Sequence, residues 1–132
     1  MVTIKAYTDL EQSKKLAEIL PIESADMHYS KDFDGSWFVD LAEYTSVKIP
    51  KYVGNIEEHL LPCWSLVALL NILNSIDGWY PGIDAQVGED NLWQICMFSY
   101  ETGSDISTAA TNKELVDTCY EVILKIKEKN LL

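Results

Sequence analysis

The apolar segment from residue 63 to residue 73 constrains the fold of this chain more than any other feature. Every residue from Cys63 to Leu73 is apolar except Ser65 and Asn71, and good helix formers are frequent among them. The segment is much shorter than the roughly 20 residues that span a bilayer. A helix that is apolar on all sides is typical of a protein interior. We therefore predict a buried core helix here, and we expect the Cys63 thiol to be inert packing within it.

Two other segments predict β-hairpins. The dipeptide Asp34-Gly35 separates two β-prone arms within residues 27–41. This dipeptide favours a type I′ turn, because both central residues of that turn need positive φ. Residues 92–100 are apolar and rich in aromatic side chains, which is typical of a strand. Residues 83–87 would pair with that strand to form the second hairpin.

A capping box predicts the first helix of the chain. Thr8 is the expected N-cap, and Glu11 at the third helical position completes the box. We expect this helix to run from about Asp9 to Leu20, because Pro21 marks its end.

The segment 111–114 (Thr-Asn-Lys-Glu) is a second capping box, and it opens the last predicted helix. Apolar residues recur at helical spacing after it, and lysines crowd its end, where positive charge complements the helix dipole. Residues 79–82 are interpreted as a turn and residues 101–111 as a loop. The order α-ββ-α-ββ-α predicts a single α+β domain over residues 1–132, in which two hairpins form an antiparallel sheet with three helices.

The charge balance excludes several classes of partner. The chain has 10 lysines, no arginine and 21 acids, for a net charge of −11. Residues 52–112 hold eight of the acids and no base. A basic stripe is the usual footprint of nucleic-acid binding, and anionic membranes repel an acidic surface. We therefore expect no direct nucleic-acid binding and no membrane binding.

The same acidity permits a sharper alternative, an acidic nucleic-acid mimic that inhibits a DNA-binding enzyme. Such a mimic would carry a dense array of carboxylates on one face, and its binding would weaken steeply with salt. The simpler interpretation is that net charge aids solubility.

The cysteines and the start of the chain indicate a cytoplasmic protein. Cys63, Cys96 and Cys119 form an odd set with no close pair, and the first ten residues do not resemble a secretory signal. Reduced thiols in a cytoplasm are the natural interpretation. Cys96 and Cys119 stand in apolar patterns, where a free cysteine behaves as a small buried hydrophobe.

The sequence around Cys63-Trp64 resembles the segment that opens the catalytic helix of papain-like cysteine proteases. A helix N-terminus would lower the pKa of the thiol and favour a nucleophilic thiolate. However, no Gln-Gly pair precedes Cys63, and both His28 and His59 lie upstream of it, whereas the base of that family lies downstream. A small cysteine hydrolase that uses Cys63 is therefore an alternative hypothesis, and a structural cysteine in a non-enzymatic protein is the main one.

No motif indicates a metal or a cofactor. The segment 57–59 (Glu-Glu-His) and Cys63 lack the second ligand pair of a zinc site. Residues 32–35 resemble part of a calcium loop, but Leu41 would then stand where the bidentate glutamate is needed. The chain has no phosphate-binding glycine loop and no nucleophile elbow.

Trp79 and Tyr80 are the best candidates for a binding site. Bulky aromatic residues in a turn are costly to expose and are enriched at interface cores. Glu89 and Asp90 would form the rim of such a surface. The alternative is that the two rings fold back and cap the core. We expect a non-enzymatic protein-binding module that binds another protein or a second copy of itself.

Four segments carry a resemblance to a known family. They are residues 7–21 (YTDLEQSKKLAEILP), 23–27 (ESADM), 62–66 (PCWSL) and 125–132 (KIKEKNLL). Together they resemble a family of short uncharacterised proteins encoded by gut bacteria and their phages or mobile elements. The resemblance implies a bacterial or phage cytoplasmic setting, and it assigns no activity, ligand or catalytic residue.

Overall fold

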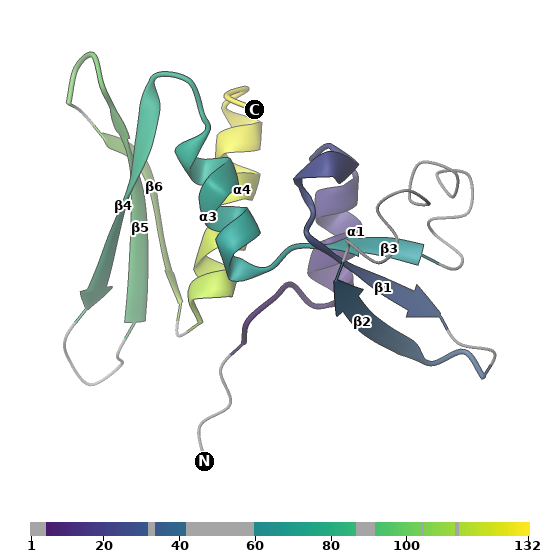
Figure 1. Cartoon of the computed structure of the whole chain (residues 1–132). Coiled ribbons are helices and arrows are strands. Elements are labelled where there is room, and N and C mark those ends of the chain that lie inside the picture. Colours follow the sequence, from purple (N-terminus) through teal and green to yellow (C-terminus); the bar gives the residue numbers. More distant parts are fainter. Residues whose placement is uncertain (1–4, 32–33, 42–59, 87–91, 104, 113) are drawn as a thin grey trace. The chain divides into compact units, whose positions relative to one another are not determined.

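The computed structural model describes residues 5–31, 34–41, 60–86, 92–103, 105–112 and 114–132 (Figure 1). These residues form a mixed α+β fold with three α-helices, one short 3-10 helix and six strands, all in antiparallel pairing. The chain divides into two compact units, which we call the N-terminal unit (Tyr7–Ala68) and the C-terminal unit (Leu69–Leu132 with Met1–Ala6). Among the described residues, no helix has the length and hydrophobicity that crossing a membrane requires.

The N-terminal unit is built on a three-stranded sheet with the order β2-β1-β3. Its elements are α1 (Leu10–Ala17), the 3-10 helix η1 (Ile22–Ser24), β1 (Met27–Lys31), β2 (Trp37–Leu41) and β3 (Leu60–Cys63). The register places Tyr29 between Val39 and Leu61, so these three side chains share one face. Tyr29, Leu61 and Cys63 form the buried cluster on that face. Pro62 lacks an N–H, and it is tolerated because β3 is an edge strand.

The hairpin around Asp34-Gly35 is confirmed, although its connection is longer than a two-residue turn. Lys31 pairs with Trp37, so residues 32–36 make the connection. Gly35 has φ +88°, a conformation that glycine adopts without strain. The Asp34 carboxylate accepts a hydrogen bond of 2.9 Å from the Ser36 N–H, which holds the pKa of Asp34 below its usual value.

The first helix is confirmed, but it ends at Ala17 rather than at Leu20, and its predicted cap was wrong by one residue. Asp9 is the N-cap: its Oδ1 accepts from the Gln12 N–H at 2.8 Å, and Gln12 Oε1 accepts from the Asp9 N–H at 3.1 Å. This is a complete capping box with Gln12 in place of Glu11. Thr8 cannot serve as the cap because its side chain is fully buried and bonded elsewhere.

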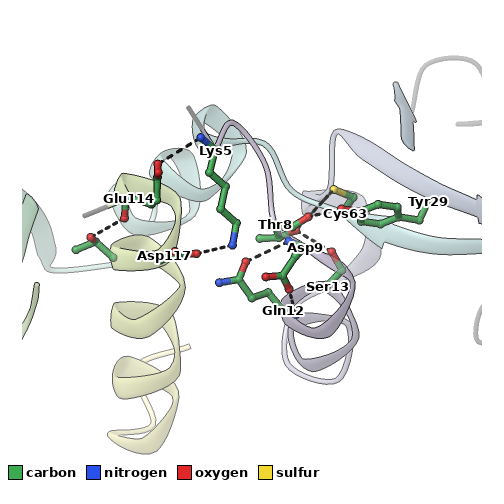
Figure 2. Close-up of polar contacts among 10 residues, drawn as sticks. Lys5, Thr8, Asp9, Gln12, Ser13, Tyr29, Cys63, Glu114 and Asp117 are labelled. Carbon is green, nitrogen blue, oxygen red and sulfur yellow. Dashed lines mark hydrogen bonds and ion pairs between the residues drawn. The ribbon is translucent and has the colours of Figure 1, made fainter. Parts of the chain in front are cut away.

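Thr8 instead joins α1 to the sheet (Figure 2). Its hydroxyl lies 2.8 Å from Ser13 Oγ and accepts the Trp64 N–H at 3.2 Å, and its N–H donates to the Trp64 carbonyl at 2.9 Å. Its carbonyl accepts the Tyr29 hydroxyl at 2.7 Å. The described buried side-chain polar atoms all have partners, so this polar cluster is fully satisfied.

The apolar segment after Cys63 forms helix α3 (Leu66–Asn74), which begins three residues later than the pattern predicts. Residues 60–63 are the strand β3, and Ser65 caps the helix by accepting the Ala68 N–H at 3.2 Å. Asp26 in turn accepts hydrogen bonds from both the N–H and the hydroxyl of Ser65. The helix is not buried on all sides as predicted, because Val67 is 64% exposed.

The C-terminal unit is built on a second three-stranded sheet, with the order β4-β5-β6. Its strands are β4 (Trp79–Gln86), β5 (Leu92–Ser99) and β6 (Asp105–Asn112), and its last helix is α4 (Leu115–Glu128). Helix α4 packs on β5 and β6, and Figure 1 shows it on one side of the sheet. Ile95 and Met97 of β5 are fully buried, as are five apolar residues of α4: Val116, Cys119, Val122, Ile123 and Ile126.

The start of α4 also differs from the prediction. Residues 111 and 112 remain in β6, paired with Gln94 and Trp93, so the predicted capping box does not form. Glu114 is the N-cap, and its carboxylate accepts the backbone N–H of Lys5 at 3.3 Å. The Lys5 ammonium lies 2.6 Å from Asp117 Oδ1 in the first turn of α4 (Figure 2). Acidic residues at a helix N-terminus complement its dipole.

Two segments interpreted as irregular are strands, and the hairpins lie in two sheets rather than one. Residues 79–82 belong to β4, whose position at the sheet edge accommodates Pro81. Residues 105–112 form β6: among their small and polar residues only Ile106 and two threonines favour a strand, and pairing with β5 completes it. Strands β3 and β6 complete the two sheets around the predicted hairpins.

The hydroxyl of Thr8 is expected to contribute to stability through this cluster. Thr8→Val should lower the free energy of unfolding by about 1–3 kcal/mol, because it leaves buried partners of Thr8 unsatisfied. Chemical denaturation measures this loss.

Thr118→Val is the matched control, since Thr118 is also fully buried but its hydroxyl donates only to the Glu114 carbonyl one turn back in α4. Equal losses for the two substitutions would contradict the role assigned to Thr8.

Candidate binding surface

The two aromatic residues predicted as one site point to opposite faces of the sheet. Trp79 and Tyr80 are consecutive in β4 and both are half-buried. Successive side chains of a strand alternate between faces. Trp79 pairs with Ser99 and shares the face of the buried Ile95 and Met97, whereas Tyr80 pairs with Phe98 on the other face. Only Tyr80 of this pair therefore belongs to the face opposite α4. The predicted rim residues, 89 and 90 (Glu89 and Asp90), lie outside the described residues.

Tyr80 packs against two aromatic residues that the sequence reasoning did not select. Its ring is stacked on Phe98, with 5.5 Å between ring centroids and an interplanar angle of 27°. Its centroid lies 4.7 Å from that of Tyr100, with the two rings tilted by 47°. Tyr100 is 70% exposed, whereas Tyr80 and Phe98 are half-buried. We call Tyr80, Phe98 and Tyr100 the aromatic patch.

The Phe98 ring packs directly against the backbone of Gly82. A Cβ atom at this position would lie 2.5 Å from Phe98 Cε2, which is closer than carbon atoms approach. The ring therefore lies directly over the backbone of β4, two residues along the strand from Tyr80. Glycine within a strand often marks such a close approach.

The aromatic patch lies on the side of the sheet opposite α4. Along β5, Ile95 and Met97 are fully buried, while Cys96 and Phe98 between and beyond them are half-buried. This alternation is the mark of a sheet that is covered on one face. Among the described elements of the C-terminal unit, Figure 1 shows no helix on the patch side of the sheet.

The surroundings of the aromatic patch are acidic. Asp84 is exposed and falls on the same face as Tyr80, and Glu101 is exposed and follows Tyr100 directly. No lysine or arginine occurs between residues 52 and 112. Aromatic faces and carboxylates both attract cations, so this surface is suited to a positively charged group.

A signal for the aromatic patch was present in the sequence. Phe98 and Tyr100 stand two residues apart in the best-predicted strand, so they share a face by alternation. Their meeting with Tyr80 depends on the β4–β5 register, which a single sequence does not fix.

Cys63, the alternative nucleophile, is fully buried in the N-terminal unit. Burial raises the pKa of its thiol, and the Thr8 hydroxyl at 3.6 Å opposes this shift only in part (Figure 2). Cys63 pairs with Met27, whereas His28 pairs with Pro62, so the thiol and the imidazole lie on opposite faces of the sheet. A buried thiol with a raised pKa is a poor nucleophile, and His28 is not placed to activate it. His59 lies outside the described residues.

No group of three or more potential metal ligands occurs among the residues that the structure describes. Residues 57–59 lie outside this set. Of the 32–35 segment, residues 32 and 33 lie outside the described residues, and Leu41 pairs with Met27 at the end of β2.

Comparisons with protein-family models, curated proteins and solved structures give no match to this chain. The similarity to short proteins of gut bacteria and phages stays a prediction, and the aromatic patch is interpreted from its own geometry.

The three thiols are expected to react at different rates. Cys96 is half-buried on the patch face, opposite Gly82, whereas Cys63 and Cys119 are fully buried. Treatment of the native protein with a thiol reagent should modify Cys96 first, and the other two should react only when the chain unfolds. Mass spectrometry of digested protein measures each site. Fast modification of native Cys63 would restore the cysteine-hydrolase hypothesis.

Stability is expected to fall at alkaline pH. Burial raises the pKa of Cys119 to about 12 and also raises that of Cys63, while unfolded thiols ionise near pH 8.5. Above that pH the unfolded state binds fewer protons than the native state, so the free energy of unfolding decreases as pH rises. Each thiol whose pKa is raised lowers the free energy of unfolding by up to about 1.4 kcal/mol per pH unit in this range.

Denaturant titrations between pH 7 and pH 11 would measure this slope. Cys119→Ala should make it shallower, whatever its effect on stability at pH 7. An unchanged slope would contradict the raised pKa of Cys119.

Proposed function

We propose that this protein is a non-enzymatic protein-binding module and that the aromatic patch is its docking surface. The observation that carries the proposal is the exposure of Tyr100, at 70%, in a ring cluster already assembled by Tyr80 and Phe98. Large aromatic side chains are enriched at the centres of protein interfaces, where they contribute most of the binding energy. Burial of one such ring stabilises a complex by about 1.5–3 kcal/mol.

The packing of the patch favours binding over a purely structural role. Phe98 rests on Gly82 and stacks on Tyr80, so two of the three rings are held in place before any partner arrives. Binding to an ordered surface loses less side-chain entropy than binding to a mobile one. Rings that served only to cap a core would be expected on the face of α4, where Trp79 lies.

The proposal includes no cofactor, no metal, no direct nucleic-acid binding and no membrane binding. The net charge of −11 repels phosphate backbones and anionic lipids. Three free cysteines support a reducing, cytoplasmic setting. The similarity to short proteins of gut bacteria and phages supports a bacterial or phage origin.

Site-specific photocrosslinking in bacterial cells tests the docking surface. Tyr100→p-benzoylphenylalanine should give a discrete adduct of higher mass after irradiation, because its ring would face the partner. The same replacement at Val67, which is 64% exposed on α3, is the matched control and should give no adduct.

The adduct at position 100 should also disappear when Tyr80→Ala disrupts the patch. A smear of products at both positions, or no adduct at position 100, would contradict the proposed function.

A further inference from the structure

We infer that the occupant of the aromatic patch is an arginine-bearing segment of another protein, an inference that rests on the proposed function. The patch combines exposed aromatic surface with carboxylates and lies in a part of the chain that has no cation. These features together select a cationic side chain that is also planar.

Two exposed acids lie beside the patch, Asp84 and Glu101. Residues 79–112 contain five acids and no base: Asp84, Glu89, Asp90, Glu101 and Asp105. Of these, Asp84 lies on the patch face, because it follows Tyr80 and Gly82 along β4 at intervals of two residues, and such residues share a face. Glu101 follows Tyr100 in the turn after β5 and is exposed.

The protein does not neutralise this charge with described residues of its own C-terminal unit. Lys5 is paired with Asp117 at the start of α4. Lys125, Lys127 and Lys129 belong to the end of α4 or follow it, and α4 covers the other face of the sheet. The chain has no arginine at all, so a guanidinium that sits on the patch must come from another molecule.

A guanidinium matches the patch better than an ammonium. It is planar and stacks on a tyrosine or phenylalanine face, while its N–H groups donate to a neighbouring carboxylate. The patch offers both partners within consecutive residues, the Tyr100 ring and the Glu101 carboxylate. An ammonium is more strongly hydrated and binds such a surface as a point charge only.

A second copy of the chain is a poor occupant. The chain contains no arginine, so it has no guanidinium to offer. Each copy carries a net charge of −11, and pairing two patches would bring their acids together. Nucleic acid is disfavoured by the same repulsion.

Peptide binding to the whole protein tests the inference. The probes are fluorescent 12-residue peptides of repeating Gly-Ser-Arg, Gly-Ser-Lys or Gly-Ser-Glu, and fluorescence anisotropy measures their affinity. The arginine peptide should bind tightest, the lysine peptide should bind more weakly at the same charge, and the glutamate peptide should not bind. Bound arginine peptide should also slow the labelling of Cys96, which lies on the patch face opposite Gly82.

Two variants separate ring contacts from charge. Tyr100→Ala should lower the affinity of the arginine peptide by about two- to fivefold, because a cation–π contact is lost. The difference in affinity between the arginine and lysine peptides should therefore become smaller. Glu101→Gln should lower the affinity of both peptides and make their binding less dependent on salt concentration. Glu23→Gln makes the same charge change at an exposed site of η1 and should leave binding unchanged. Circular dichroism and denaturation verify that each variant folds.

Equal affinity for the arginine and lysine peptides, or no effect of Tyr100→Ala, would overturn the inference. So would a crosslink at position 100 that joins two copies of the chain, or a partner whose crosslinked segment lacks arginine. In those last two cases the docking surface would stand and only its occupant would be wrong, whereas the absence of any crosslink would remove the proposed function itself.

Discussion

The antiparallel register between β4 and β5 is the constraint on which the candidate surface depends. It places Tyr80 opposite Phe98 and Gly82 opposite Cys96, so that the Phe98 ring lies over a residue without a side chain. A slip of β5 by one residue would move Phe98 to the face of α4, away from Tyr80, and turn Ile95 and Met97 to the patch side. The fully buried side chains of Ile95 and Met97 oppose such a slip, because it would expose them. Core packing on one face therefore fixes the arrangement of rings on the other.

The N-terminal unit is organised around a polar residue rather than an apolar one. Thr8 has no exposed surface, yet its hydroxyl, N–H and carbonyl all have partners on α1, β1 or the segment after β3. Buried polar groups are costly unless every bond is satisfied, and a satisfied cluster favours one arrangement over others. Cys63 belongs to this cluster as a weak partner of Thr8 and packs with Tyr29 and Leu61 in the buried cluster of the sheet.

Local signals in the sequence predicted part of this structure, and long-range pairing decided the rest. Asp34-Gly35 and the apolar residues 92–99 gave reliable positions for β2 and β5, because turn chemistry and strand composition act locally. The cap of α1 was misplaced because Thr8 and Asp9 are both good caps, and only the burial of Thr8 distinguishes them. Strand β6 was missed because most of its residues are small or polar, which is typical of a loop, and its strand-favouring residues are only Ile106 and two threonines. Of the candidate site, Tyr80 was selected, but its partners Phe98 and Tyr100 became visible only through the register.

The salt bridge between Lys5 and Asp117 has a consequence for dissecting the chain. Residues 5 and 6 belong with residues 69–132, so the N-terminal unit is an insertion in the sequence of the C-terminal one. A fragment that starts at residue 69 would lack the ammonium that neutralises Asp117 and the backbone N–H bound by Glu114. Genetic excision of residues 7–64 with a short flexible linker would keep both, would leave helix α3 with its Ser65 cap, and is therefore the better route to an autonomous half that carries the rings.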